Sequence, residues 1–399
     1  MKDIKKDFPV LVNNPSLIYL DTCATALKPQ RVIDKLNEYY EKYGVNVNRG
    51  VYDLSYQATL EYEETRTLTA KFLNARSNEI VFTKGASNGL NLVASSYGLN
   101  FINEGDEIIT SELEHHSNVI PWQNVATKKK ATLKFIELDS TGRITVEAFK
   151  KVLTEKTKVV ALTYISNVMG YITPIKEIIE LAHSVGAIVI VDAAQAVPHM
   201  KVDVKDLNCD FLAFSAHKML GPTGFGILYG KYNLLQKMEP IEFGGDMNDN
   251  VDLFESHYKD APYKFETGTP PIAEAIAFKE AIKYLEEYGY ENIQKNEQKL
   301  TNYVLNELSK IDNITIYNPT VETGTISFNI NNVHPHDAAT FFGEYHIALR
   351  AGHHCAQLIT KWLECIGTLR VCFYIYNDIN DAKKFIEAAK AAAEYFKEW

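Results

Sequence analysis

The sequence has little cysteine, no excess of positive charge and no long hydrophobic run. Its 399 residues contain five cysteines, which are scattered and form no Cys-X-X-Cys pair. A disulfide framework is therefore not expected, and an odd number of thiols fits a protein in a reducing compartment. The first residues carry charges with no apolar stretch after them, so we predict no signal peptide and a cytoplasmic location.

The charge balance argues against a nucleic-acid partner. Asp and Glu outnumber Lys and Arg by 51 to 41, which gives a formal charge of −10, and the one notable basic run covers only residues 128–130. Nucleic-acid binders usually show a basic excess or stripe. The apolar runs 159–165 and 187–191 are far shorter than the ~20 residues that cross a bilayer, so no membrane partner is expected either.

Strand-like and helix-like segments alternate over the first 260 residues or so. The expected strands lack strict polar alternation, as is usual for strands covered on both faces, and amphipathic segments lie between them. This pattern predicts an α/β fold with a mostly parallel sheet. The strands are expected at 78–83, 107–110, 132–136, 158–164, 187–192, 211–215 and 225–229, and the helices at 57–73, 88–98, 145–154 and 175–185.

The pattern changes after about residue 260. We predict a large domain at 15–265 and a smaller α+β C-terminal domain at 266–399, with residues 1–14 packed on the smaller one. The connecting segment 242–270, rich in Gly, Asp and Pro, is predicted as a loop. In the smaller domain, helices are expected at 272–288, 293–311 and 379–397, and strands near 325–330 and 347–350.

Polar residues follow two of the strands, at the sheet edge where α/β folds bind ligands. Asp192 ends one strand, and Lys218 follows the next together with His217. One strand–helix–strand unit separates Asp192 from Lys218, so both can point into one crevice. A lysine for a Schiff base and an aspartate for a pyridinium nitrogen are what pyridoxal phosphate chemistry needs. Taken singly, Asp192 also fits a helix N-cap and Lys218 a surface loop.

A phosphate site is predicted where the strand 78–83 leads into a helix. Ala86 and Ser87 offer backbone N–H groups and a hydroxyl there, which suits an anion, although a plain helix cap also explains this turn. His115 follows another strand, and an imidazole can stack on a flat cofactor ring. The adjacent His116 also suggests zinc, but no HExxH or Cys-X-X-Cys accompanies the pair, so no metal site is predicted.

Cys355 is the cysteine with a distinctive setting. It ends the run Gly352-His353-His354-Cys355, a glycine-hinged loop in which neighbouring imidazoles favour a thiolate. The alternative is a buried structural cysteine, as we expect for Cys209. Cys365 and Cys372 fall in or near predicted helix and strand and are expected in the core.

Together these features resemble the fold-type I pyridoxal-phosphate enzymes called class V aminotransferases, and within them the SufS-type (group II) cysteine desulfurases. The resemblance runs nearly end to end, from Tyr19-Leu20-Asp21 to the last helix. Its most specific motifs are Glu114-His115-His116-Ser117-Asn118, Ser166-Asn167-Val168, Val191-Asp192-Ala193-Ala194-Gln195, Ser215-Ala216-His217-Lys218, Glu266-Thr267-Gly268-Thr269-Pro270 and Arg350-Ala351-Gly352-His353-His354-Cys355-Ala356.

The resemblance implies a role for each matching residue. Lys218 would carry the cofactor as a Schiff base, Asp192 would pair with its pyridine nitrogen, and His115 would stack on its ring. Arg370 would bind the substrate carboxylate, and Cys355 would accept the sulfur. The remaining implied contacts are Asn167 and Gln195 to the ring's phenolic oxygen, Ala86, Ser87, Ser215, His217 and the second subunit's Thr269 at the phosphate, and Arg49 and Asn167 at the substrate.

The implied activity is conversion of L-cysteine to L-alanine in a homodimer, with sulfur passed to Cys355 as a persulfide and His115 exchanging a proton with the substrate thiol. The implied purpose is iron–sulfur cluster assembly through a SufU-type, or SufE-type, acceptor protein. In relatives that use a SufU-type partner, the residue matching His336 takes over a zinc ligand of that partner. A surface loop histidine is the alternative for His336.

The chain also departs from the family pattern. Cys23 stands where a small residue is usual, Asn48 and Tyr52 stand where histidines are common, and Ala86-Ser87 replaces two threonines. Two alternatives therefore stay open: a selenocysteine lyase or another class V enzyme, in which sulfur release does not depend on Cys355, and a non-catalytic sulfur-relay scaffold.

Overall fold

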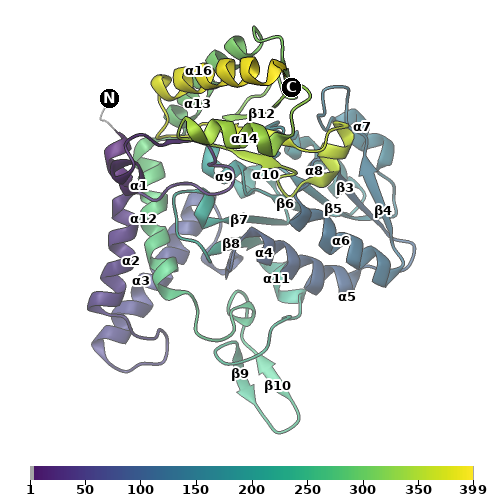
Figure 1. Cartoon of the computed structure of the whole chain (residues 1–399). Helices are drawn as coiled ribbons and strands as arrows, with labels where there is room; N and C mark the ends of the chain where they lie inside the picture. Colours follow the sequence, from purple (N-terminus) through teal and green to yellow (C-terminus); the bar gives the residue numbers. More distant parts are fainter. Residues whose placement is uncertain (1–3, 399) are drawn as a thin grey trace.

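A seven-stranded sheet with helices on both faces forms the larger part of the computed structural model, which describes residues 4–398 (Figure 1). All strands run parallel except β8, which is antiparallel to β2 and β7. The α/β fold with a mostly parallel sheet is thus confirmed. The strand order is β2 (Ile80–Thr83), β8 (Gly226–Gly230), β7 (Phe211–Ser215), β6 (Ile188–Asp192), β5 (Thr157–Thr163), β3 (Glu107–Ser111) and β4 (Thr132–Ile136).

The strands lack polar alternation because both faces of the sheet are covered. On β6, Ile188 and Ile190 belong to one hydrophobic core and Val189 and Val191 to the other. Only the edge strand β4 is largely half-buried or exposed. One face carries α4 (Ala86–Val93), α6 (His116–Lys129) and α11 (Tyr232–Lys237), and the other carries α3 (Asp53–Leu73), α7 (Val146–Val152), α8 (Ile175–Ser184) and α12 (Ile272–Tyr288).

A second sheet, four-stranded and antiparallel, lies beside the first (Figure 1). Its strands and helices share a separate hydrophobic core that contains Leu300, Phe328 and Phe385. The expected helices and strands of this region are confirmed to within a few residues. The order is β11 (Ile314–Ile316), β12 (Thr325–Ile330), β15 (Thr368–Cys372) and β14 (Arg350–Gly352), with α13 (Tyr290–Leu308), α14 (Pro335–Glu344) and α16 (Ile379–Tyr395) packed against it.

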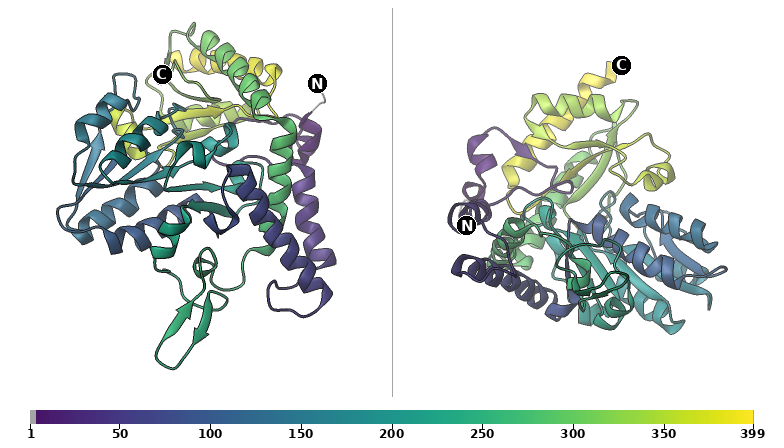
Figure 2. Two further views of the ribbon diagram at one scale, coloured as in Figure 1. Left: turned by 180° about the vertical axis from the view of Figure 1, so that it is seen from behind. Right: turned by 90° about the horizontal axis from the view of Figure 1, so that it is seen from below.

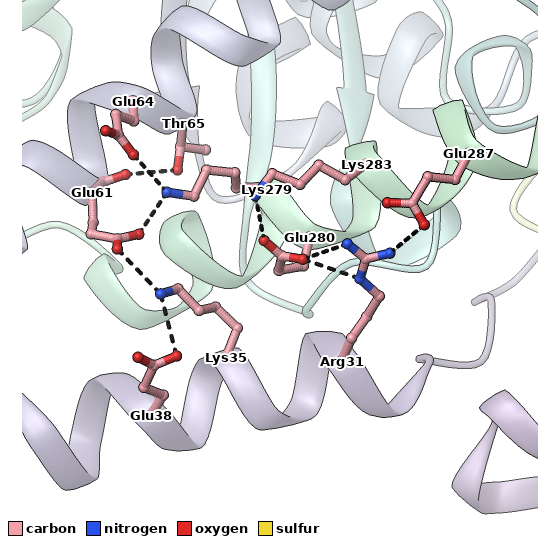
Figure 3. Close-up of polar contacts among 10 residues, drawn as sticks. All are labelled: Arg31, Lys35, Glu38, Glu61, Glu64, Thr65, Lys279, Glu280, Lys283 and Glu287. Atoms are coloured by element: carbon pink, nitrogen blue, oxygen red, sulfur yellow. Dashed lines mark hydrogen bonds and ion pairs between the residues drawn. The ribbon is translucent and has the colours of Figure 1, made fainter.

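An ion-pair network joins α12 to α2 (Gln30–Lys42) and α3. Lys279 Nζ lies 2.6 Å from Glu61 Oε2, and Lys35 Nζ lies 3.2 Å from Glu61 Oε1, so one carboxylate links three helices (Figure 3). A second ion-pair cluster nearby joins Arg31 on α2 to Glu280 on α12 (Figure 3). The helix α12 therefore packs on α2 and α3. It begins after residue 265, where we expect the boundary between the two domains, and the position of that domain boundary stays a prediction.

The segment 242–270 contains a β-hairpin that the sequence analysis did not predict. The strands β9 (Asn248–Val251) and β10 (Ser256–Tyr258) form it, and it projects away from the sheets (Figure 1 and the left view of Figure 2). At its tip, Leu253 is 93% exposed and Phe254 99% exposed. Two large apolar side chains exposed side by side are unusual on a monomer surface and indicate an interaction.

Short elements complete the chain. The strand β1 (Ile18–Tyr19) pairs in parallel with β13 (Ile347–Ala348) in a separate two-stranded sheet, which ties the N-terminal segment to the chain just before β14. No helix within residues 4–398 is long and apolar enough to cross a membrane. The remaining helices are α1 (Pro9–Asn13), α5 (Leu99–Phe101), α9 (Ala196–His199), α10 (Val204–Leu207) and α15 (Gln357–Trp362). Met1–Asp3, part of the N-terminus that we expect on the smaller domain, lie outside the described residues.

Candidate active site

A cavity of about 280 Å³ opens at the carboxyl ends of β5, β6 and β7, between the large sheet and the smaller one. Most of the predicted site residues line it, although they come from distant parts of the sequence. The lining residues are Cys23, Ala24, Ala86, Ser87, His115, Ser117, Thr163, Ile165, Asn167, Asp192, Ala194, Gln195, Ser215, His217, Lys218, Arg350, His354, Cys355 and Arg370.

Lys218, which is half-buried, and Asp192, which is buried, both line this cavity and influence each other's ionisation. Burial lowers the pKa of Lys218, although the Asp192 carboxylate opposes this effect. Burial raises the pKa of Asp192, against the influence of Lys218 and of the Ala194 N–H, which donates to Asp192 Oδ1 at 3.0 Å. A lowered pKa leaves more of the lysine amine unprotonated at neutral pH, so the amine can act as a nucleophile and accept a proton. A buried carboxylate needs a cationic partner.

Small polar groups gather where β2 leads into α4. The Ala86 N–H donates to Ser215 Oγ at 2.8 Å, and Ser87 Oγ lies 2.6 Å from Ser117 Oγ. Close backbone packing positions this turn, because a Cβ on Gly226 would lie 2.5 Å from the Cα of Gly85. Hydroxyls and backbone N–H groups at a helix N-terminus are suited to a phosphate.

His115 and His217 are both neutral at physiological pH. Burial, followed by the nearby Lys218 charge, lowers the pKa of each imidazole to about 4. His115 caps α6 by accepting the Ser117 N–H at Nδ1, at 3.1 Å, which leaves Nε2 for a ligand. His217 Nδ1 lies 3.2 Å from Thr25 Oγ1.

Three polar side chains line the part of the cavity next to the smaller sheet. Gln195 Nε2 donates to the Cys23 carbonyl at 2.8 Å, and Asn167 Nδ2 donates to the His354 carbonyl at 2.8 Å. Arg370, on β15, donates from Nη1 to the Asn167 carbonyl at 2.8 Å, and its Nε is buried without a hydrogen-bond partner among the described residues. Arg370 thus has donors available for an anion.

Cys355 is exposed in a strained loop at the opening of the cavity. His354 and Cys355 have φ angles of 52° and 55°, a left-handed conformation that costs about 1 kcal/mol or more per residue outside glycine. The Cys355 carbonyl accepts the His116 N–H at 2.7 Å. Burial, followed by the charge of Arg370, lowers the pKa of His354 to about 2, so this imidazole is neutral and adds no positive charge beside the thiol. Our expectation of help from His354 is therefore wrong.

Three predicted site residues lie outside the cavity. Thr269 is exposed, and Arg49 is 69% exposed and forms an ion pair with Asp246 at 2.8 Å. His336 is exposed at the start of α14, near Gly352 in the Cys355 loop, where a Cβ would lie 3.7 Å from His336 Nε2. Within one chain, these three residues do not line the cavity.

Two functional features escaped the sequence analysis. Asp21 accepts hydrogen bonds from Arg350 Nε and Nη2, at distances down to 2.8 Å, and lies 3.5 Å from Arg370 Nη2, so one carboxylate positions both arginines. Ser117 joins His115 to Ser87. Arg350 belongs to the motif that contains Cys355. Its ion pair with Asp21, 329 residues away, could not be recognised from any sequence pattern.

The cavity residues fit pyridoxal phosphate. A buried carboxylate, a lysine of lowered pKa and a cradle of hydroxyls and N–H groups correspond to its pyridine nitrogen, aldehyde and phosphate. Gln195 Oε1 is buried with no hydrogen-bond partner among residues 4–398, which is costly unless a ligand satisfies it. No group of three or more potential metal-ligating side chains is placed to hold a metal ion within the described part of the chain.

Comparisons with known proteins agree with this geometry. The family model "Aminotransferase class-V" matches residues 18–385. A probable cysteine desulfurase of Halalkalibacterium halodurans is 50% identical over 99% of this chain and 98% of its own. The solved apo structure of a cysteine desulfurase from Thermococcus onnurineus has a TM-score of 0.95 at 39% identity, covering 99% and 98% of the two chains. The cysteine desulfurase CsdA of Escherichia coli, in an S-sulfonic acid form, has a TM-score of 0.93 at 35% identity, covering 98% of each.

Proposed function

The chain belongs to the class V aminotransferase family and is a cysteine desulfurase with pyridoxal phosphate as its cofactor, and from this premise we propose the roles of its residues. In this proposal Cys355 takes the sulfur of L-cysteine and L-alanine is released. The observation that carries it is the single cavity that brings Lys218, Asp192, Arg370 and Cys355 together.

The cofactor would be held at three points. Lys218 would bind its aldehyde carbon, Asp192 its pyridine nitrogen, and the turn around Ala86 and Ser87 its phosphate, together with Ser215 and His217. His115 would stack on the ring, and Gln195 and Asn167 would reach the phenolic oxygen. When bound, pyridoxal phosphate withdraws electrons from the substrate Cα and so makes its proton removable.

Arg370 would bind the carboxylate of L-cysteine, with help from Asn167. Its guanidinium is buried and already oriented by the Asn167 carbonyl and by Asp21, so little conformational freedom is lost when the substrate arrives. A charge-assisted bidentate contact with a carboxylate then fixes the substrate orientation.

Two side chains would transfer the protons of the reaction. Lys218 Nζ, with its lowered pKa, accepts the Cα proton from the substrate. His115 Nδ1 is occupied by the Ser117 N–H, so Nε2 is the ring atom left to exchange a proton with the substrate thiol.

The sulfur step would take place at Cys355. Its thiolate attacks the substrate sulfur, a sulfur–sulfur bond forms, and the bond from that sulfur to the substrate carbon breaks. The carbon keeps the electron pair and takes up a proton, which gives L-alanine and a Cys355 persulfide. Because Cys355 is exposed on a loop, the persulfide would then be accessible to an acceptor protein.

A homodimer would complete the site. Thr269 and Arg49 line no part of their own chain's cavity, and both are exposed. Val51 is fully exposed beside Arg49, and the hairpin tip carries Leu253 and Phe254. We propose that a second copy covers this surface, receives Thr269 at its phosphate site and brings Arg49 to the substrate.

The acceptor we propose is a SufU-type protein that serves iron–sulfur cluster assembly in the cytoplasm, which would place the chain in the SufS-type group. His336 stands exposed near Gly352 and is thus available as a ligand for the zinc of such a partner. Five free cysteines support a reducing compartment. A SufE-type acceptor is the competing possibility, which a comparison of the two proteins as activators decides.

The experiment supplies the purified holoenzyme with L-cysteine and dithiothreitol, which reduces the persulfide to sulfide, and measures alanine and sulfide, with and without a SufU-type protein. We expect both products in equal amounts, activation by the partner, and loss of activity in Cys355→Ala. Cys365→Ala, which changes a cysteine outside the cavity, is the matched control. A Cys355→Ala variant that still releases sulfide from L-cysteine at the normal rate would instead favour a selenocysteine lyase or another class V enzyme, and no turnover at all would favour a scaffold.

A further inference from the structure

Two buried cysteine thiols lie close together beside the cavity and Arg370. Cys23 lines the cavity and is 3% exposed, and Cys372, on β15, is 1% exposed. Both sulfurs approach the hydroxyl of Thr325, which lies 3.1 Å from Cys23 Sγ and 3.9 Å from Cys372 Sγ. This geometry contrasts with the third buried cysteine, Cys209, which lies in the core of the large sheet.

The backbone holds both cysteines firmly in register. The Cys372 N–H donates to the Leu20 carbonyl at 2.8 Å, and Asp21 forms a parallel bridge with Cys372. Gln195 holds the Cys23 carbonyl. Disulfides form between cysteines whose Cβ atoms are about 4 Å apart, and the shared Thr325 hydroxyl and the backbone bridge hold these two side chains in the same neighbourhood.

The electrostatics make one thiol of the pair a nucleophile. Burial raises the pKa of Cys23, but the hydrogen bond from Cys372 and the charge of Arg370 outweigh it, so the pKa is lowered overall. Burial and the neighbouring Cys23 raise the pKa of Cys372. A thiolate next to a protonated thiol, beside a cavity that small molecules enter, is the usual arrangement of a redox-active pair.

We propose that Cys23 and Cys372 are a redox-active pair that hydrogen peroxide, or a small organic hydroperoxide, converts to a disulfide within the substrate cavity. The Cys23 thiolate attacks the terminal peroxide oxygen and the oxygen–oxygen bond breaks. The departing hydroxide, or alkoxide from an organic hydroperoxide, takes up a proton and leaves as water or an alcohol. Cys372 then loses its proton and attacks the sulfenic sulfur, the sulfur–oxygen bond breaks, and the hydroxyl leaves as water. The two thiols lose two electrons, which the peroxide gains.

The disulfide weakens substrate binding, a consequence that rests on the proposed role of Arg370. A sulfur–sulfur bond is about 2.05 Å long, so the two sulfurs must move closer than their present non-bonded contact. Cys372 lies two residues after Arg370 on the same strand, and Cys23 lies beside Asp21, which contacts Arg370 Nη2. Moving both displaces the guanidinium, and misplacement of a binding group by about 1 Å is enough to lower affinity severely.

The test uses holoenzyme carrying Cys355→Ala, which removes the exposed reactive thiol. After peroxide treatment, a digest without reductant should contain one cross-linked peptide pair joining Cys23 to Cys372, lighter by two hydrogens than the free peptides. Titration with L-cysteine, followed by the cofactor absorbance, should give binding at least tenfold weaker than before, and dithiothreitol should restore it.

Matched variants separate the possible outcomes. Adding Cys372→Ser, or Cys23→Ala if the first variant folds poorly, should abolish the cross-link and the loss of binding, whereas Cys209→Ala should change neither. Oxidation of Cys23 without a cross-link to Cys372 would contradict the proposal that the two cysteines form a redox-active pair. A cross-link that leaves L-cysteine binding unchanged would contradict the proposed effect of the disulfide on substrate binding. The cross-link is read without substrate, so failure of L-cysteine to bind the reduced protein would count against the proposed function alone.

Discussion

At the scale of single residues, Arg370 has the most sharply defined task. Its guanidinium is buried and positioned by the Asn167 carbonyl and by Asp21, and its Nε has no hydrogen-bond partner within residues 4–398. Such a group binds a carboxylate through two parallel hydrogen bonds, which a lysine ammonium cannot reproduce. Substrate affinity should therefore depend on the planar shape of the Arg370 guanidinium as well as on its charge.

We predict that Arg370→Lys raises KM for L-cysteine by about 10- to 100-fold, since a hydrogen bond to a charged group contributes about 1.5–3 kcal/mol. Steady-state kinetics measure the change, and retention of the cofactor absorbance shows that the cavity is intact. An unchanged KM would mean that Arg370 does not bind the carboxylate.

The site residues could be predicted where the chemistry is local, and not where it depends on distant contacts. Asp192, Lys218 and Ser215 follow strands, so their meeting at one sheet edge could be derived from the sequence. The contacts of Asp21 with both Arg350 and Arg370 could not be predicted. Arg350 lies 329 residues from Asp21, and no local pattern shows which distant arginine a carboxylate will contact. The neutral state of His354 depends on its burial, which the sequence does not display.

At the scale of elements, Arg66 on α3 connects the helix to the loop that carries Thr269. Its side chain is fully buried, binds Glu266 Oε1 at 2.7 Å and Oε2 at 2.9 Å, and donates to the Ile80 carbonyl on β2. The same carboxylate accepts the Phe82 N–H. The guanidinium also lies 4.1 Å from the centre of the Phe82 ring, a cation–π contact.

We predict that Arg66→Met lowers the free energy of unfolding by about 3–5 kcal/mol, because it leaves the Glu266 carboxylate buried without its partner. The control is Lys295→Met, which breaks the exposed pair with Glu291 and should cost about 1 kcal/mol or less. Urea denaturation measures both variants, and equal losses would contradict a special role for the buried pair.

The strands of the large sheet and the hairpin β9–β10 differ in how well the sequence predicts them. Strands β5 to β8 were predictable because unbroken apolar runs need cover on both faces. The hairpin β9–β10 was not, because Asn248, Asp249 and Asn250 have low strand propensity and its residues are mostly exposed. A hairpin with no core of its own, tipped by apolar side chains, needs a partner to cover it, which the sequence of one chain does not show.

At the scale of the whole molecule, the exposed hairpin tip predicts dimerisation. We expect the wild-type protein to sediment as a dimer, and Leu253→Asp with Phe254→Asp to sediment as a monomer with reduced activity, because two charges would be buried unpaired. Val12→Asp, at another exposed apolar position, is the control and should leave the dimer intact. A wild-type monomer with full activity would contradict the proposed completion of the site by Thr269.

The buried histidines predict how stability depends on pH. Next to Arg370 and Arg350, burial lowers the pKa of His354 to about 2, whereas the unfolded imidazole titrates near pH 6.5. Below about pH 6.5 the unfolded chain therefore binds a proton that the folded chain does not. The free energy of unfolding falls as pH decreases from about 6.5, by at most about 1.4 kcal/mol per pH unit for this group.

Denaturation between pH 7 and 5 measures this slope. His354→Asn keeps a polar group but does not titrate, so the variant should lose stability less steeply than the wild type, whatever its stability at pH 7. Identical slopes for the two proteins would show that His354 is protonated in the folded state.

The central claim is that Cys355 receives the sulfur of L-cysteine, and one measurement tests it most directly. The holoenzyme is mixed with L-cysteine in the absence of reductant, quenched with an alkylating agent and digested, and the peptide containing Cys355 is weighed. The account predicts a gain of one sulfur atom on Cys355, which dithiothreitol removes and which is absent in Lys218→Ala. Alanine formed at the normal rate with no added sulfur on Cys355 would contradict it.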